Sequence, residues 1–307
     1  MKKIFLIFII LLNTISFAQD KTYTEQNVSI NKFIDGSLLI PNNYSNSTLT
    51  IIISDSGPTD RNGNQNFTKS YNLKKLAISL AEKNIASYRY DKRIVKQIRY
   101  GRVDNNIMFD DFITDANSVI DYFKSKNIFN KIYIIGHGQG SLVGMVAAKG
   151  KADGFISLAG AGKSIDNVII DQIELTAAIY TEDAKRVFKE LKQGKTTDDY
   201  PEGLASIFSK DLQPFISNWM QYNPQEEINQ LQIPKLIISG TKDLQVSVEE
   251  ATLLNDASKN STLKIIDKMN HILVPIEGDD LENSKSYNES YRKLSPEVVK
   301  FIASFIK

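Results

Sequence analysis

The chain of 307 residues contains no cysteine. Disulfide bonds, thiolate metal sites and a lipid-modified N-terminal cysteine are therefore excluded. An apolar core must supply the stability, and a chain of this length can build one. Histidine is scarce as well, because only His137 and His271 are present. Any reaction that needs an imidazole must use one of these two side chains.

A surplus of positive charge is also missing. Lysine and arginine number 37 against 36 aspartates and glutamates, for a formal net charge of +1. Proteins that bind nucleic acid need a basic surface to neutralise phosphates, so no nucleic-acid partner is expected.

No apolar run is long enough to cross a membrane, which takes about 20 residues. The run from Ile4 to Leu12 is shorter, follows two lysines, and precedes the small residues of Ser16-Phe17-Ala18. This pattern is typical of a secretory signal peptide over residues 1–18, cleaved before Gln19, with an uncleaved anchor as the alternative. We expect an exported protein, periplasmic or secreted, with no membrane partner after cleavage.

Apolar runs of strand length alternate with segments of helical periodicity along most of the chain. This alternation predicts an α/β fold with a mostly parallel sheet and helices on both faces. The expected strands lie near 49–54, 85–91, 131–136, 154–160, 234–240 and 261–267, and "NVSI" and "GSLLIP" before them look like short paired strands. The expected helices lie near 72–84, 109–126 and 140–149, after Ser247 (with Glu250 completing a capping box), and after Ser295-Pro296.

The alternation stops between residues 163 and 230. Apolar side chains recur there at helical spacing, Gly194 is a stop signal, and the only tryptophan, Trp219, lies in this stretch. We interpret it as an inserted helical cap. The predicted organisation is a core in two parts, residues 19–162 and 231–307, with the cap at 163–230 between them.

The stretch "IIGHGQGSLVG" (134–144) has the spacing of a Gly-x-Ser-x-Gly nucleophile elbow, but its central residue is Gly138. A sharp strand-to-helix turn needs small residues two positions on either side of its centre. Gly136 and Gly140 satisfy this requirement around Gly138. Ser141, the alternative nucleophile, is flanked at those positions by Gln139 and Val143, so we expect it in the first helical turn as a packing residue.

Two further residues follow strands farther along the chain. His271 comes after the last expected strand, and Asp243 comes after the strand at 234–240. Loops at the carboxyl ends of parallel strands meet at one edge of a sheet, so the pair can serve as base and orienting acid beside the elbow. His137 is the alternative base, and helix capping is the alternative role for Asp243.

Several motifs in order, "SGPTDRNGN", "YDKR", "GHGQGSLVGM", "GTKDLQVSVEEATLL" and "MNHIL", resemble those of α/β-hydrolase esterases. The resemblance is to the serine-aminopeptidase-like, bile-acid-acyltransferase-related type and covers essentially the whole chain after residue 18. It implies the α/β-hydrolase fold, a nucleophilic serine at the position of Gly138, and Asp243 and His271 as acid and base. It also implies an oxyanion hole from the backbone N–H groups of Gln139 and Ser56.

The chain departs from that pattern at two further places. Asp55 stands where the family usually has glycine, and Ile94-Val95 stand where it has a glycine-bearing turn. We expect both departures to reshape the mouth of the pocket.

Glycine at the elbow removes the group that forms an acyl-enzyme. Loss of a nucleophile in serine hydrolases costs on the order of 10⁶ in turnover. We therefore expect a carboxylic-ester hydrolase of weak or lost activity, acting on a small acyl ester without cofactor or metal. The alternatives are a secreted ligand-binding pseudoenzyme, a hydrolase in which His271 and Asp243 activate water directly, and a peptidase. Gly138→Ser is expected to restore hydrolysis.

Overall fold

The computed structural model describes residues 22–44 and 47–307. The predicted signal peptide, residues 1–18, lies outside the described residues. Within the described part, no helix combines the length and apolar character needed to cross a bilayer.

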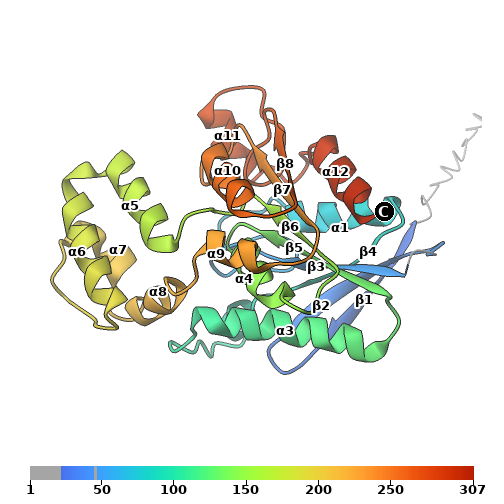
Figure 1. Ribbon diagram of the computed structural model, residues 1–307, viewed down its shortest axis with the longest axis horizontal. Helices are drawn as coiled ribbons and strands as arrows, with labels where there is room; N and C mark the ends of the chain where they lie inside the picture. The colour runs from blue at the N-terminus through green and yellow to red at the C-terminus, as the bar shows by residue number, and fades with distance from the viewer. Residues whose placement is uncertain (1–21, 45–46) are drawn as a thin grey trace, which may run out of the picture.

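An eight-stranded sheet forms the centre of the molecule, in the order β1-β2-β4-β3-β5-β6-β7-β8 (Figure 1). β1 pairs with β2 and β2 with β4 in antiparallel fashion, and all other pairs are parallel. The strands are β1 (Tyr23–Ser29), β2 (Asp35–Pro41), β3 (Thr48–Ile53), β4 (Ala86–Tyr90), β5 (Lys131–His137), β6 (Gly154–Leu158), β7 (Lys235–Gly240) and β8 (Ser261–Ile266).

Helices cover both faces of this sheet (Figure 1). α3, α4, α9 and α10 share one hydrophobic core with the sheet, and α1 and α12 contribute to a second core. The predicted mostly parallel sheet with helices on both faces is confirmed. The main helices are α1 (Asn72–Glu82), α2 (Arg93–Arg99), α3 (Phe109–Lys126), α4 (Gln139–Ala148), α5 (Ile165–Thr176), α6 (Thr181–Lys192), α7 (Ala205–Phe208), α8 (Gln213–Trp219), α9 (Pro224–Gln230), α10 (Val248–Ala257), α11 (Asp280–Ser286) and α12 (Pro296–Ile306).

The segment 163–230 is helical, and α5 to α8 lie to one side of the sheet (Figure 1). These helices have a small core of their own around Phe188 and Phe208. Aromatic stacking joins them to α3, because the rings of Phe109 and Trp219 are 5.4 Å apart and nearly parallel. α9 differs from the others, since its Ile228 is part of the main core.

The start of α10 corrects one expectation. Ser247 is the N-cap residue, but its side chain makes no capping hydrogen bond. The carboxylate of Glu250 instead accepts hydrogen bonds from the backbone N–H groups of Gly162 and Lys163, both at 2.7 Å. The loop after β6 thus occupies the carboxylate that the predicted capping box would have used.

Candidate active site

A tight turn joins β5 to α4, with Gly138 at its centre. Gly138 has φ 53° and ψ −121°, a conformation that strains any residue with a side chain. A Cβ at Gly136 would lie 2.3 Å from the carbonyl oxygen of Gly140, and a Cβ at Gly140 would lie 2.4 Å from that of Ile53. Both flanking positions therefore require glycine, which is the reason the sequence has small residues there.

Ser141 lies outside the reactive region. It is in the first turn of α4, 1% exposed, and its Oγ is 2.7 Å from the Oγ of Ser157 on β6. This hydrogen bond between two buried hydroxyls ties the helix to the sheet. Ser141 is a packing residue, as its register predicted.

His271 and Asp243 meet at the carboxyl ends of β8 and β7. Nδ1 of His271 is 2.8 Å from Oδ2 of Asp243. The other carboxylate oxygen of Asp243 accepts hydrogen bonds from the N–H groups of Gln245 and Val246. Asp243 therefore orders its own loop and orients the imidazole. It does not cap the following helix, because α10 begins only at Val248 and its N-cap residue is Ser247.

The other histidine, His137, is hydrogen-bonded to the backbone of His271. Nε2 of His137 is 2.8 Å from the carbonyl oxygen of His271, so this nitrogen must be the donor. The His137 side chain is buried, and burial together with the nearby charge of His271 lowers its pKa. We assign His137 to positioning the backbone of His271.

Asp55, in the loop after β3, lies at the centre of the site and corrects the expectation that it shapes the pocket mouth. Its Oδ2 is 3.0 Å from Nε2 of His271. Its Oδ1 accepts the backbone N–H groups of Gln139 at 2.9 Å and of Ser56 at 2.6 Å. The two N–H groups named as oxyanion-hole donors thus converge on one oxygen atom, and that atom belongs to Asp55.

The Asp55 carboxylate also fills the space above the elbow. An ideal Cβ on Gly138 would lie only 1.9 Å from Oδ1 of Asp55. The central role of Asp55 was missed in the sequence. The available signal was that residues 55 and 138 both differ from the motifs that the sequence resembles.

The charges of the site are strongly coupled. Burial alone raises the pKa of Asp55, but the hydrogen bond and charge of His271 hold it well below the ordinary value. Burial lowers the pKa of His271, but the charge and hydrogen bond of Asp243 and the hydrogen bond to Asp55 raise it to about 10. At neutral pH the site therefore contains an imidazolium between two carboxylates.

A buried lysine, Lys92, contacts the residue that follows Gly138. Nζ of Lys92 donates a 2.6 Å hydrogen bond to the side-chain oxygen of Gln139 and lies over the ring of Phe112. Burial lowers the pKa of Lys92 to about 8, while the charge of Asp55 acts in the opposite direction. Lys92 thus orients the residue whose N–H binds Asp55. Ile94 and Val95 lie in the first turn of α2, close to Lys92. No residue of α2 lines the cavity at Asp55 and Gly138, so these two residues do not shape its mouth as expected.

A cavity of about 370 Å³ opens above these groups, a size suited to a small molecule. Asp55, Gly138 and His271 line it, together with residues of α5 and with Trp219 at the end of α8. Apolar side chains line much of it, among them Leu142, Ile165, Val168, Ile169 and Trp219, and polar side chains that include Lys163, Gln172 and Gln245 also line it.

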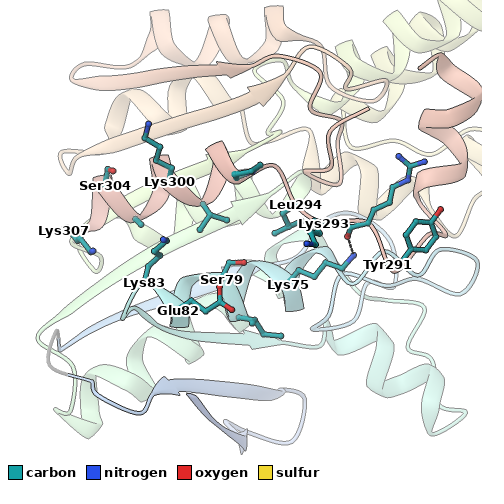
Figure 2. A pocket seen from close by; sticks show the side chains of 15 residues that line it. Lys75, Ser79, Glu82, Lys83, Tyr291, Lys293, Leu294, Lys300, Ser304 and Lys307 are labelled. Carbon is teal, nitrogen blue, oxygen red and sulfur yellow. Dashed lines mark hydrogen bonds between the residues drawn. The ribbon is translucent and has the colours of Figure 1, made fainter. Parts of the chain in front are cut away.

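A larger hollow of about 880 Å³ lies elsewhere, between α1 and α12 (Figure 2). Figure 2 shows Lys75, Lys83, Lys300 and Lys307 around it. Lys75 is already bonded to the carbonyl oxygen of Arg292 at 2.6 Å. None of the elbow, Asp55, Asp243 or His271 lines this hollow.

Asp55, His137 and His271 are close enough to be considered as metal ligands. A ligand nitrogen must offer a lone pair, however. Nε2 of His137 donates to a carbonyl oxygen, and both nitrogens of His271 face carboxylates. This arrangement does not fit a metal ion, and the expected absence of metals and cofactors stays a prediction.

No family model matches the chain. Esterase EstD of Thermotoga maritima is 24% identical over 273 residues, which are 85% of this chain. The chain spans 63% of the length of that curated relative.

Solved structures resemble the chain over almost its whole length. Est1E from Butyrivibrio proteoclasticus covers 92% of this chain and 98% of its own, with a TM-score of 0.57 and 17% identity. A dienelactone hydrolase from Anabaena variabilis covers 92% and 97%, with a TM-score of 0.52 and 13% identity. The Pyrococcus furiosus esterase Pf2001 covers 92% and 90%, with a TM-score of 0.53 and 14% identity. The chain has the α/β-hydrolase fold and is similar to esterases of that fold.

Proposed function

We propose that the protein is a hydrolase of small carboxylic esters, built on a serine-esterase site whose nucleophile position is Gly138. The observation that carries the proposal is the arrangement around the elbow. The His271–Asp243 pair and two converging N–H groups lie at the turn where a nucleophile would stand. The similarity to an esterase from Thermotoga maritima supports the same reaction class.

Two features keep ester turnover low in the chain as it stands. Gly138 has no hydroxyl group, so no acyl-enzyme forms there. The N–H groups of Gln139 and Ser56 are occupied by Asp55, so a substrate carbonyl oxygen must displace a carboxylate to reach them.

Direct activation of water by His271 is the least favourable of the alternatives. A general base needs a free lone pair, and Nε2 of His271 is hydrogen-bonded to Asp55. Ligand binding without turnover remains the outcome that an experiment must separate from ester hydrolysis. No feature of the cavity favours a peptidase.

The structure changes the expected effect of Gly138→Ser. A serine Cβ at this position would collide with Oδ1 of Asp55. We therefore expect Gly138→Ser alone to stay near background. The double variant Asp55→Gly/Gly138→Ser frees both the space and the N–H groups, and it should hydrolyse p-nitrophenyl acetate orders of magnitude faster than either single variant.

Adding His271→Ala to the double variant is the control, and it should return the rate to background. Ser141→Ala in the same background should leave the rate within a few-fold, because Ser141 only packs. A double variant that folds but stays inert would contradict the proposal. Tight binding of an acyl ligand without turnover would then favour the pseudoenzyme.

Export is proposed on the N-terminal sequence pattern alone. N-terminal sequencing of protein recovered outside the cytoplasm should begin at Gln19. Recovery of only the full-length chain from the membrane fraction would favour the uncleaved anchor.

A further inference from the structure

We propose that Asp55 is itself a nucleophile, which takes an alkyl group from a small electrophile and forms an ester that water then cleaves. The electrophile is a tetrahedral carbon bearing a leaving group, as in an alkyl halide or an epoxide. This activity goes beyond acyl-ester hydrolysis, because the bond that breaks first joins the leaving group to a tetrahedral carbon.

The backbone N–H groups of Gln139 and Ser56 bind one carboxylate oxygen of Asp55 and leave the other facing His271. They hold Oδ1 of Asp55 at 2.9 Å and 2.6 Å, while Oδ2 lies against the imidazole of His271. If an alkyl group is attached to Oδ2, Cγ of Asp55 becomes an ester carbonyl whose oxygen, Oδ1, is already in a two-donor oxyanion hole. Water attacking Cγ places negative charge on Oδ1, where both donors stabilise it. The hole is therefore organised around the carbon of Asp55.

The contacts of Asp55 that keep acyl-ester turnover low in this chain do not hinder displacement at a tetrahedral carbon. Attack on an acyl carbonyl develops charge on the substrate's oxygen, and the N–H groups that would stabilise it are bound to Asp55. Displacement at a tetrahedral carbon develops charge on the leaving group and needs no oxyanion hole. The apolar part of the 370 Å³ cavity, formed by Leu142, Val168 and Trp219 among others, suits an uncharged alkyl group.

The atoms and charges balance over two steps. Oδ2 first attacks the carbon, a C–O bond forms, and the leaving group departs with the bonding electron pair. Asp55 is now neutral, so His271 loses one of the two charges that hold its proton. It gives that proton to the opened epoxide oxygen or, with a halide, to solvent.

In the second step, neutral His271, held by Asp243 at Nδ1, takes a proton from water as the water oxygen attacks Cγ. The intermediate collapses with cleavage of the Cγ–Oδ2 bond. Oδ2 leaves in the alcohol, which receives the proton from His271. The water oxygen stays on Cγ, and its remaining proton passes to Nε2 of His271, which regenerates the Asp55 carboxylate and the imidazolium. The net reaction converts an alkyl halide and water to an alcohol and acid, or an epoxide and water to a diol.

Isotope labelling tests this sequence directly. The full chain is incubated with 1-bromobutane or 1,2-epoxybutane in ¹⁸O-enriched water, and its peptides are analysed by mass spectrometry. The peptide containing Asp55 should gain one ¹⁸O atom, and the first-turnover product should contain none from water. His271→Gln, and independently Asp243→Asn, should accumulate the alkyl adduct on Asp55, because the second step is slowed.

Asp55→Asn should show neither label nor adduct at residue 55, whereas Asp121→Asn, at an exposed carboxylate on α3, should behave like the parent chain. If ¹⁸O enters Asp55 with only one of the two probes, that probe identifies the electrophile as an alkyl halide or as an epoxide. Turnover without label in Asp55, or a folded chain that neither turns over nor becomes alkylated with either probe, overturns the proposal. The ester test uses another variant and substrate, so the two proposals can fail separately.

Discussion

The carboxylate of Asp55 and any side chain on Gly138 compete for one space, since a Cβ at residue 138 would lie 1.9 Å from Oδ1 of Asp55. Residue 138, in the turn after β5, and Asp55, in the loop after β3, are therefore sterically coupled. The carboxylate gains the N–H of Gln139 and the imidazole of His271 in the same position.

This competition predicts a coupling in stability. Gly138→Ala should lower the free energy of unfolding by about 1–3 kcal/mol, because it combines backbone strain with a collision. In an Asp55→Gly background the collision disappears, so the cost should shrink by roughly 0.5–3 kcal/mol. Urea unfolding of the four proteins measures this coupling.

Gly150→Ala is the matched control for that cycle. Gly150 has φ 66°, yet a Cβ there would meet no heavy atom within 4 Å. The loss of unfolding free energy in Gly150→Ala should come from backbone strain alone, and it should be the same with or without Asp55→Gly. Strict additivity of Gly138→Ala and Asp55→Gly would contradict the steric relationship.

The protonation of His271 should depend on Asp55. With a pKa of about 10, His271 should stay protonated at pH 8 in the parent chain. Asp55→Asn removes one carboxylate, and the pKa should fall by roughly 1–3 units. The chain has only two histidines, so NMR titration of the imidazole signals distinguishes them, and His137 should remain neutral. An unchanged His271 titration in Asp55→Asn would argue against the ion pair.

Stability should vary with pH in a way that follows from these shifts. The pKa of His271 is raised from 6.5 to about 10, so its contribution is complete below pH 6.5 and is lost as pH rises towards 10. The pKa of Lys92 is lowered from 10.5 to about 8. The free-energy cost of burying its charge is therefore lost as pH rises from about 8 to 10.5, and stability gains by that amount. Thermal unfolding should show a decline from pH 6.5 to 8 that flattens above 8. In Lys92→Met the decline should continue above pH 8, whereas in Asp55→Asn it should end at a lower pH, because the pKa of His271 is lower there.

Contact between α8 and α3 should depend on the only tryptophan. Trp219 stacks on Phe109 and also lines the cavity. Trp219→Ala should cost at least about 1 kcal/mol and speed proteolysis within α5 to α8, since the stacked pair is lost. Trp219→Phe, which keeps a ring, should lie between the parent chain and Trp219→Ala. Equal proteolysis of all three proteins would show that other contacts hold these helices.

The sheet could be predicted from the sequence because its central strands are buried on both faces and appear as continuous apolar runs, as in β3 and β5. Asp243 and His271 could be located because residues after neighbouring parallel strands meet at one edge. The position of Asp55 could not, because it depends on a distance between two loops. The same limit explains Glu250, whose carboxylate is bound by the loop at Gly162.

Because residues 55 and 138 compete for one space, the order in which the two positions are substituted matters. Gly138→Ser as the first step produces a crowded protein. Asp55→Gly as the first step leaves an intact turn, two free N–H groups and an oriented imidazole, with an empty position that a later serine can fill. On the two proposals above, a change from a carboxylate nucleophile to a serine nucleophile therefore passes through the Asp55→Gly chain, which keeps glycine at residue 138 and has neither nucleophile.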